Sequence, residues 1–365
     1  MFGQYEDGGQ RIEDSAKAGR RLSLSSILYP LSSLFLLFTL ATGCDRGGGT
    51  GAANEVVIYT SVDEPVARPI LDEFTRRTGI KVATQTDTEA NKSAGLVARL
   101  EAEKGSPRAD VWWGNEVFRT INLADAGVLA PYESPSAKDV PPLFKDPSHL
   151  WAGSALRARV IVVHVDPGAR EVEPLPNGSI EDLTRPELKG SVAIANPRAG
   201  TTSGHVAALY VLWGEPKAEQ FFKALRANGA KVLGGNGDVA TQVAAGAVWV
   251  GLTDNDDVDN VLREGGKVRM VLPDQREGGA GTLTIPCTVA LVKGAQRAEN
   301  AKKLIDYLLS AEVEKRLIDA KFARYSVRGG QGPEAVKPMR VDYREVAKVL
   351  PHAAKRAEAI LVGRE

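Results

Sequence analysis

Residues 55–84 read EVVIYTSVDEPVARPILDEFTRRTGIKVAT, and the fold class follows from the order of apolar and polar residues in them. The apolar run over 55–60 predicts a buried strand, and the run over 80–84 predicts a second one. Between them, a helix with one apolar face begins at Pro65 and ends at Gly79. The order of strand, helix and strand indicates the start of a parallel sheet that is covered by helices.

The same alternation continues through most of the chain. Further strands are expected at 110–113, 159–165, 191–195, 231–233, 247–252, 268–271 and 282–292. Further helices are expected at 91–104, 116–126, 202–213, 216–228, 238–245, 256–264 and 353–361, and over 298–319 with a break near Ser310. The pattern predicts two α/β units in one chain, and the long apolar strands over 159–165 and 282–292 are the candidates to cross between them.

The composition is that of a folded, neutral protein. The 365 residues include 46 Lys and Arg against 46 Asp and Glu, and this balance argues against a nucleic-acid surface. Hydrophobic residues make up 43% and charged residues 25%, which excludes a disordered chain. The chain contains 2 cysteines, which excludes a disulfide-framed miniprotein.

The N-terminal segment has the anatomy of an export signal. Residues 27–40 form an apolar run that is short for a membrane span, with arginines before it and small residues after it. The end resembles a bacterial lipobox that leads to Cys44, although Ala41 stands where Leu is preferred. We therefore expect a signal peptide at 1–43, a lipid on Cys44 and a Gly-rich tether at 44–54. The alternative is a short anchor helix with an incidental cysteine.

Ligands in such folds bind outside the carboxyl ends of strands, which directs attention to four loops. They read YTSVDE (59–64), WWGNE (112–116), NPRAGTTSGH (196–205) and TDNDD (253–257). In the second loop, Trp112 and Trp113 point to opposite faces, so one is expected in the core and the other along a cleft. The third loop favours an anion at a helix N-terminus, unless Thr201, Thr202 or Ser203 is only the helix cap.

The fourth loop places Asp254, Asp256 and Asp257 where a helix begins. They either cap that helix or supply oxygen atoms to a cation or to the hydroxyl groups of a solute. A secreted hydrolase that uses Ser203 and His205 is a remote alternative, because no nucleophile elbow is visible. No Cys/His pattern indicates a zinc site.

Several ordered stretches resemble type II periplasmic solute-binding proteins of the ferric-ion class, which serve ABC importers. They are VVIYTSVDEPVARPILDEFTRRTGIKV, PRADVWWGNEVFRTINLADAGVLAPY, ARVIVVHVD with IANPRAGTTSGHVAALYVLWGE, and GLTDNDDVDNVLREGGKVRMVLPDQ with GTLTIPCTVALVKGAQRAENAKKLIDYLLS. The resemblance implies two lobes, each a mostly parallel sheet flanked by helices, with two crossover strands as the hinge. The implied boundaries are 55–158 plus about 290–325 for lobe 1, 159–289 for lobe 2 and 326–365 for a C-terminal extension.

The resemblance also implies the positions that hold the solute. Asp63 falls where ferric-binding relatives often have a histidine, and Asn115 or Glu116 falls where they have a glutamate. Their adjacent tyrosine pair is replaced by Asp256-Asp257. Their anion-binding turn matches Thr201–Gly204, with Asn236 as its companion. The metal ligands expected in this way are Asp63, Glu116, Asp256 and Asp257. The other expected ligand-binding residues are Ser61, Asn115, Thr201, Thr202, Ser203, Gly204, Asn236 and Asp254.

The function implied is a lipoprotein without enzymatic activity that carries ferric iron as cargo, alone or with a synergistic anion, and needs no cofactor. Carboxylates are less selective for iron than phenolates, so an anionic organic solute such as a sugar phosphate or a phosphonate stays open. The implied partners are an ABC permease with its ATPase and, through the lipid, a membrane. We expect an exported, lipid-anchored monomer on the periplasmic or cell-surface side that binds no nucleic acid.

Overall fold

The computed structural model describes residues 54–87, 93–165, 175–198, 200–329 and 332–363. The predicted signal peptide, Cys44 and the tether up to residue 53 lie outside the described residues. Within the described part of the chain, no helix combines the length and the apolar character that a membrane span requires.

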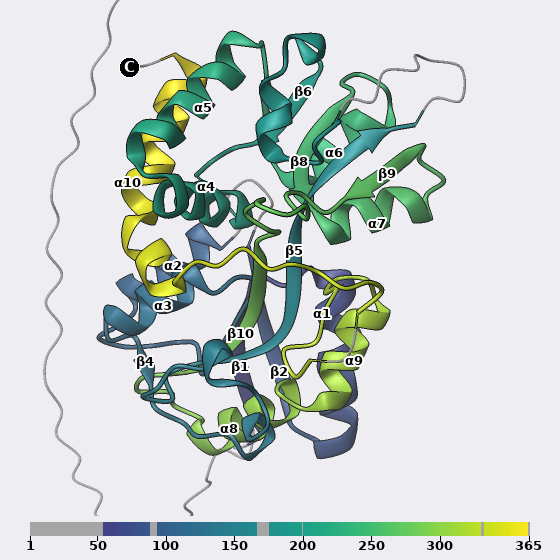
Figure 1. Ribbon diagram of the computed structural model, residues 1–365. Helices are drawn as coiled ribbons and strands as arrows, with labels where there is room; N and C mark the ends of the chain where they lie inside the picture. Colours follow the sequence, from purple (N-terminus) through teal and green to yellow (C-terminus); the bar gives the residue numbers. More distant parts are fainter. Residues whose placement is uncertain (1–53, 88–92, 166–174, 199, 330–331, 364–365) are drawn as a thin grey trace, which may run out of the picture. The chain divides into compact units, whose positions relative to one another are not determined.

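The first lobe is a parallel sheet with helices on both faces (Figure 1). Its parallel strands, in the order β2–β1–β3, are β1 (Glu55–Thr60), β2 (Lys81–Thr86) and β3 (Val111–Gly114). Its helices are α1 (Glu64–Thr78), α2 (Ala94–Ala102), α3 (Phe118–Asp125), α8 (Ala298–Leu308) and α9 (Ala311–Asp319). Helix α1 ends, as its sequence predicts, at Gly79 in the left-handed conformation, which glycine adopts without strain.

Two long antiparallel strands join this sheet to the rest of the molecule. Strand β5 (Ala152–His164) pairs with β10 (Thr284–Val292) over its first half. Over its second half it pairs with β8 (Val250–Asp254) and β9 (Val268–Val271). Strand β5 therefore belongs to both lobes. It begins seven residues before the predicted strand at 159–165, because Gly153, Ser154 and Arg157 interrupt the apolar pattern that marks a buried strand.

The second lobe repeats the alternation of strands and helices. Its strands are β6 (Val192–Ala195), β7 (Lys231–Leu233), β8 (Val250–Asp254) and β9 (Val268–Val271), with β8–β6–β7 parallel to one another. Its helices are α4 (Gly200–Trp213), α5 (Glu215–Ala227), α6 (Asn236–Ala244) and α7 (Asn255–Arg263). The connections carry β4 (Leu129–Ala130) and short 3-10 helices at Pro135–Ala137, Pro142–Phe144, Ile180–Thr184 and Pro186–Leu188.

The core consists of two apolar clusters, one on each face of the sheets. One cluster includes residues of α2, α3, α4 and α5, and the other includes residues of α1, α6, α7, α8 and α9. Trp112 belongs to the first cluster and Trp113 to the second, and both are fully buried. The prediction that one of these tryptophans lines a cleft is therefore wrong, because helices cover both faces of β3.

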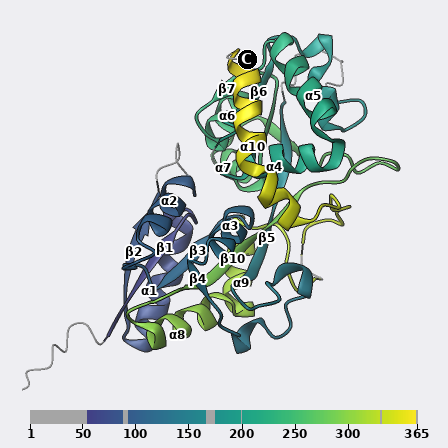
Figure 2. The ribbon, with the colours of Figure 1, turned by 90° about the vertical axis from the view of Figure 1, so that its left-hand side faces the viewer.

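The C-terminal helix α10 (Tyr343–Val362) is much longer than the predicted helix at 353–361. It packs along α4 and α5 of the second lobe, and its N-terminal part contacts α3 of the first (Figure 2). Arg344 Nη2 donates to Asp146 in the first lobe, whereas Arg356 Nε donates to Glu219 at 2.7 Å in the second. The C-terminal extension therefore connects the two lobes a further time.

Candidate solute-binding pocket

A small pocket lies where the carboxyl ends of strands from both lobes meet. Asn115, directly after β3, lines it from the first lobe, and Asp254, the last residue of β8, lines it from the second. Arg157 of the shared strand β5 lies between them. The enclosed volume is about 10 Å³, room for about one water molecule, so the protein's own side chains nearly fill it.

Helix N-termini surround this pocket. The first residues of α4 and α6 line it, and α7 begins immediately after Asp254. Gly200 opens α4 with φ of 56°, a left-handed conformation that glycine adopts readily. The first N–H groups of a helix have no partner within the helix and carry a partial positive charge. The pocket wall in the second lobe therefore favours a negatively charged group.

Two arginines that the sequence analysis did not single out hold the aspartates. Arg157 Nη2 donates to both carboxylate oxygens of Asp256, at 2.6 and 2.7 Å, and lies 3.0 Å from Asp254 Oδ2. Arg159 Nη1 donates to Asp254 Oδ1 at 2.7 Å. Both arginines are at most 2% exposed. Because they are two residues apart in β5, they lie on the same face of the strand.

Arg159 also organises the polar residues at the start of α4 and α6. Its Nη1 atom donates to Thr201 Oγ1 at 3.2 Å and to Asn236 Oδ1 at 3.1 Å, and its Nε atom donates to His205 Nδ1 at 3.3 Å. Thr202 Oγ1 donates to the same Asn236 oxygen at 2.9 Å. The predicted anion turn and its companion asparagine are therefore joined in one network by a buried cation.

The protonation states of the pocket follow from burial and from these charges. Burial alone would raise the pKa of Asp254, but Arg157 and Arg159 outweigh it and lower this pKa to about 2. Burial opposes the charge of Arg157, but Asp254 and Asp256 outweigh burial and raise its pKa. Burial, reinforced by Arg159, lowers the pKa of His205 to about 3. At neutral pH, Arg157 and Asp254 are therefore charged and His205 is neutral.

The pocket contains hydrogen-bond donors that the protein does not satisfy. Within the described ranges, two residues that line it have buried donors without a hydrogen-bond partner, at Asn115 Nδ2 and at Arg157 Nε and Nη1. Arg159, which bonds to Asp254 of the lining, has a further unpaired donor at Nη2. Leaving a buried donor unpaired costs roughly 1–3 kcal/mol, and more for a charged group. A ligand that presents several acceptor oxygens would satisfy these donors, so the chemistry of the pocket favours an oxyanion.

Asp254, Asp256 and Asp257 also form an acidic group. Their carboxylate oxygens lie within 4.8 Å of one another, close enough to share one metal ion. Arg157 already pairs with Asp254 and Asp256, and Arg159 also pairs with Asp254. Asp257 accepts a hydrogen bond from Thr253 Oγ1 at 2.9 Å. A cation bound here would therefore have to compete with the arginines, or bind together with an anion that offsets its charge.

The structure gathers about half of the predicted ligand-binding residues around this pocket. Those that line it are Asn115, Thr201, Thr202, Asn236, Asp254 and Asp257. Asp256 lies against Arg157. Ser61 sets the orientation of Asn115, since Ser61 Oγ donates to Asn115 Oδ1 at 3.0 Å.

The remaining predicted residues have other contacts. Asp63 precedes α1 as its N-cap residue, and Glu116 accepts from the backbone N–H groups of Phe118 at 2.6 Å and Arg119 at 3.2 Å, which caps α3. Burial raises the pKa of Glu116. Among the described residues, the acidic group that is close enough to share one ion contains neither Asp63 nor Glu116.

Ser203 and Gly204 lie where the two lobes touch. Ser203 Oγ donates to Gly200 O at 2.8 Å, and Arg119 Nη2 of the first lobe donates to Ser203 Oγ at 3.1 Å. A Cβ atom on Gly204 would lie 2.3 Å from the ring of Phe118, so only glycine fits at this contact. The nearby His205 instead accepts from Arg159.

The sequence did contain a signal for the missed arginines. The run ALRARV at 155–160 places two cations at alternating positions in an otherwise apolar segment. Such cations on one face of a strand are either exposed or paired inside the protein. Their partners are about 100 residues further along the chain, so the sequence alone does not reveal which case applies.

The comparison with known families decides the class of this protein. Residues 56–322 match the family described as bacterial extracellular solute-binding protein. The chain belongs to this family. The predicted resemblance, the two-lobed α/β fold and the exported, solute-binding class are thereby confirmed.

Named relatives of this solute-binding protein include carriers of iron. Over 292 residues it is 26% identical to "Iron uptake protein A1" of Synechocystis, covering 77% of this chain and 78% of that protein. Its structure is similar to the apo ferric ion-binding protein A of Pasteurella haemolytica, with a TM-score of 0.74 and 25% identity over 84% of this chain and 98% of that one.

One structural relative was solved with a phosphorylated sugar. The periplasmic binding protein AfuA of Actinobacillus pleuropneumoniae, with exogenous fructose-6-phosphate bound, matches with a TM-score of 0.70 and 25% identity. The match covers 85% of this chain and 97% of that one. Both kinds of solute considered from the sequence are thus represented among proteins of similar structure.

Proposed function

We propose that this protein is the solute-binding component of an ABC importer and that it captures ferric iron together with an oxyanion in the pocket between its lobes. The named iron-binding relatives support the metal. The observation that carries the proposal is that unsatisfied donors of Asn115 and Arg157 line the same pocket as two of the three aspartates, Asp254 and Asp257. Because the pocket encloses only about 10 Å³, the lobes must part to admit such a solute, and a charged solute that contacts both lobes then favours their closure.

The oxyanion is needed because the pocket already contains buried positive charge. Arg157 and Arg159 neutralise much of the acidic group, so a ferric ion without a counter-anion would meet strong repulsion. An oxyanion on the unsatisfied donors adds negative charge and oxygen ligands at the same place. Asp257 lines the pocket and belongs to the acidic group, so it is the protein carboxylate that we assign to the metal.

The test is a calorimetric titration of the purified protein with ferric nitrilotriacetate, with and without phosphate or citrate. We expect saturable binding that requires the anion. The substitution Asp257→Asn should weaken it at least about tenfold, equivalent to about 1.4 kcal/mol. The control Glu264→Gln, at the exposed C-terminal end of the same helix, should bind like the wild type. Failure of iron to bind with either anion would contradict the assignment of iron.

A second candidate solute is a phosphorylated organic compound that binds without metal. The unsatisfied donors favour it, because a phosphate group offers them acceptor oxygens, while the aspartates accept hydrogen bonds from hydroxyl groups. Fructose-6-phosphate in metal-free buffer is the probe. Saturable binding of this sugar phosphate, combined with no response to ferric salts, would establish the second candidate in place of the first.

The anchoring and the absence of catalysis are also part of the proposal. The lipobox-like sequence before Cys44 supports lipid attachment. Ser203 Oγ donates to Gly200 O, whereas His205 Nδ1 accepts from Arg159, and these separate contacts support binding without catalysis. We propose that the protein acts as a monomer. Expression of Cys44→Ser should release the protein from membranes into the soluble fraction, whereas retention in the membrane fraction would contradict lipid attachment.

A further inference from the structure

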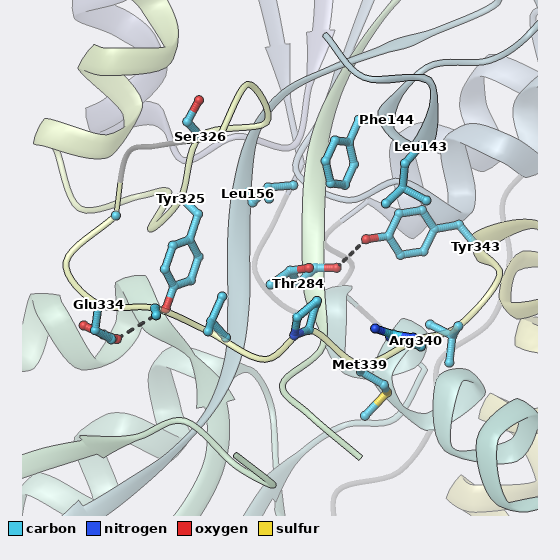
Figure 3. Close-up of a pocket in the computed structure, with 16 residues that line it drawn as sticks. Leu143, Phe144, Leu156, Thr284, Tyr325, Ser326, Glu334, Met339, Arg340 and Tyr343 are labelled. Carbon is cyan, nitrogen blue, oxygen red and sulfur yellow. Dashed lines mark hydrogen bonds between the residues drawn. The ribbon is translucent and has the colours of Figure 1, made fainter. Parts of the chain in front are cut away.

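A second, much larger cavity lies away from the solute pocket, beneath the segment that leads into α10. Its volume is about 830 Å³, within the range of about 300–1,000 Å³ that is typical of small-molecule sites. Leu156 of β5 and Thr284 of β10 form its floor, and the described residues of the 332–341 segment cover it. Figure 3 shows Tyr325 with Glu334 on one side and Leu143, Phe144 and Tyr343 on the other.

The walls of this cavity are mainly apolar. Side chains from several parts of the chain contribute, namely Leu143, Phe144, Leu156, Val336, Met339 and Val341. Leu143, in the connection before β5, is 64% exposed and is the most exposed of the large apolar side chains in the described residues. Apolar surface at the rim of a cavity favours a ligand with an apolar body, because binding removes that surface from water.

The hydroxyl groups in the cavity already hold the covering segment in place. Tyr343 Oη donates to Thr284 O at 2.9 Å, and Tyr325 Oη donates to Glu334 Oε1 at 3.3 Å. Glu334 is also paired with Arg324, whose Nη2 atom lies 2.8 Å from its Oε1 atom. Together with the backbone hydrogen bonds of Thr282 to Lys337 and Met339, these contacts hold the segment over the cavity.

Arg340 is the lining residue whose charge is not balanced locally. It is exposed, and the described part of the chain provides no ion pair or hydrogen bond to its guanidinium. Glu334, the other charged residue of the lining, is already paired with Arg324. A guanidinium binds a carboxylate through two parallel hydrogen bonds. The charge at this rim therefore complements an anionic head group.

We propose that this cavity is a second ligand site, which takes an amphipathic carboxylate with its head on Arg340 and its apolar body against Leu156 and Phe144. This site is separate from the solute pocket and does not depend on which solute the protein carries. The covering segment runs directly into α10, which contacts both lobes. The occupant therefore contacts the part of the chain that joins the lobes outside the hinge strands.

Binding of decanoate below its micellar concentration tests the proposal, with calorimetry on the purified protein. We expect saturable binding of decanoate, weaker binding of decanol and none of acetate, because both the apolar body and the head group contribute. Arg340→Gln should weaken decanoate binding about tenfold, whereas Arg340→Lys, which keeps the charge, should retain most of it. Val336→Trp should weaken decanoate binding by occupying part of the cavity, and circular dichroism should show that this variant is folded.

Thr202→Ala in the solute pocket distinguishes the two sites. It should leave decanoate binding unchanged. The proposal is overturned if decanoate does not saturate the wild-type protein, if Arg340→Gln and folded Val336→Trp both bind it normally, or if Thr202→Ala abolishes its binding.

Discussion

At the scale of single residues, the buried arginines determine what the pocket can bind. Arg157 and Arg159 bring two positive charges into a site where the sequence shows aspartates. A buried ion pair gains little over an apolar pair of the same shape, but removing one partner leaves an uncompensated charge in the interior. The pairing therefore restricts which residues can be changed without loss of stability, and it explains why Asp257 is a cleaner probe of binding than Asp256.

The first prediction concerns this pairing. Arg157→Met should lower the free energy of unfolding by roughly 3–5 kcal/mol, because Asp256 loses its partner while it stays buried. Adding Asp256→Leu should restore part of that loss. Urea unfolding followed by circular dichroism measures both, with the exposed pair Arg68–Glu64 as control, where Arg68→Met should have little effect. Equal stabilities for Arg157→Met and the wild type would contradict the pairing.

The second prediction concerns His205 and pH. Its pKa of about 3 in the folded protein lies below the usual value of about 6.5, so the unfolded chain takes up a proton first as the pH falls. This group should therefore lower stability by up to about 1.4 kcal/mol per pH unit between pH 6 and pH 3, and have no effect above pH 7. His205→Gln should show a shallower decline of unfolding free energy over that window. An unchanged slope would mean that His205 takes up a proton in the folded state.

At the scale of elements, helix α4 shows how the C-terminal extension completes the second lobe. Every described residue from Gly200 to Tyr210 is buried, because α5 and α10 pack against this helix. A helix that is covered on all sides lacks the apolar stripe of a surface helix. The sequence of α4 is therefore that of a helix in the protein core, and α10 is required to shield its apolar side chains from water.

The third prediction tests that cover. Ala357 is fully buried in α10, and Lys355 is exposed two residues before it. Ala357→Glu should cost roughly 3–5 kcal/mol of unfolding free energy, because it buries an unpaired charge. Lys355→Glu, as matched control, should change the stability by less than about 0.5 kcal/mol. If the two variants have the same urea midpoint, α10 does not belong to the cooperative core.

At the scale of the whole molecule, the hinge strands and the contacts between the lobes set the capacity to close. Arg119 Nη2 in α3 donates to the backbone oxygen of Arg198 at 2.8 Å, and Phe118 lies against Gly204 of α4. These contacts connect the first lobe to the start of the anion-binding helix. The affinity for a solute therefore depends on whether α3 of the first lobe and the start of α4 in the second can come into contact.

The fourth prediction follows from the Phe118 contact. Gly204→Ala places a methyl group where the ring lies 2.3 Å away, so the lobes must stay slightly apart. We expect at least a tenfold loss of affinity for ferric iron with its oxyanion, equivalent to about 1.4 kcal/mol. The melting temperature of the protein without ligand should change little. Gly105→Ala is the control, because a Cβ atom there meets nothing within 4 Å. Unchanged affinity in Gly204→Ala would show that this contact does not limit closure.

The order of strands and helices, the two α/β units and the loops that surround the pocket could be predicted from the sequence. These features depend on local patterns, such as the helix between Pro65 and Gly79 and the break at Ser310 between α8 and α9, which neighbouring residues encode.

The sequence does not reveal which polar residues meet in the pocket, how far α10 extends or what pairs with the aspartates, and the folded structure does. Arg157 and Asp256 lie 99 residues apart in sequence, and their pairing depends on the register of β5 against β8. Burial makes that pairing energetically important, and burial is a property of the folded chain as a whole. The chemistry of the site therefore depends on long-range packing that no local pattern encodes.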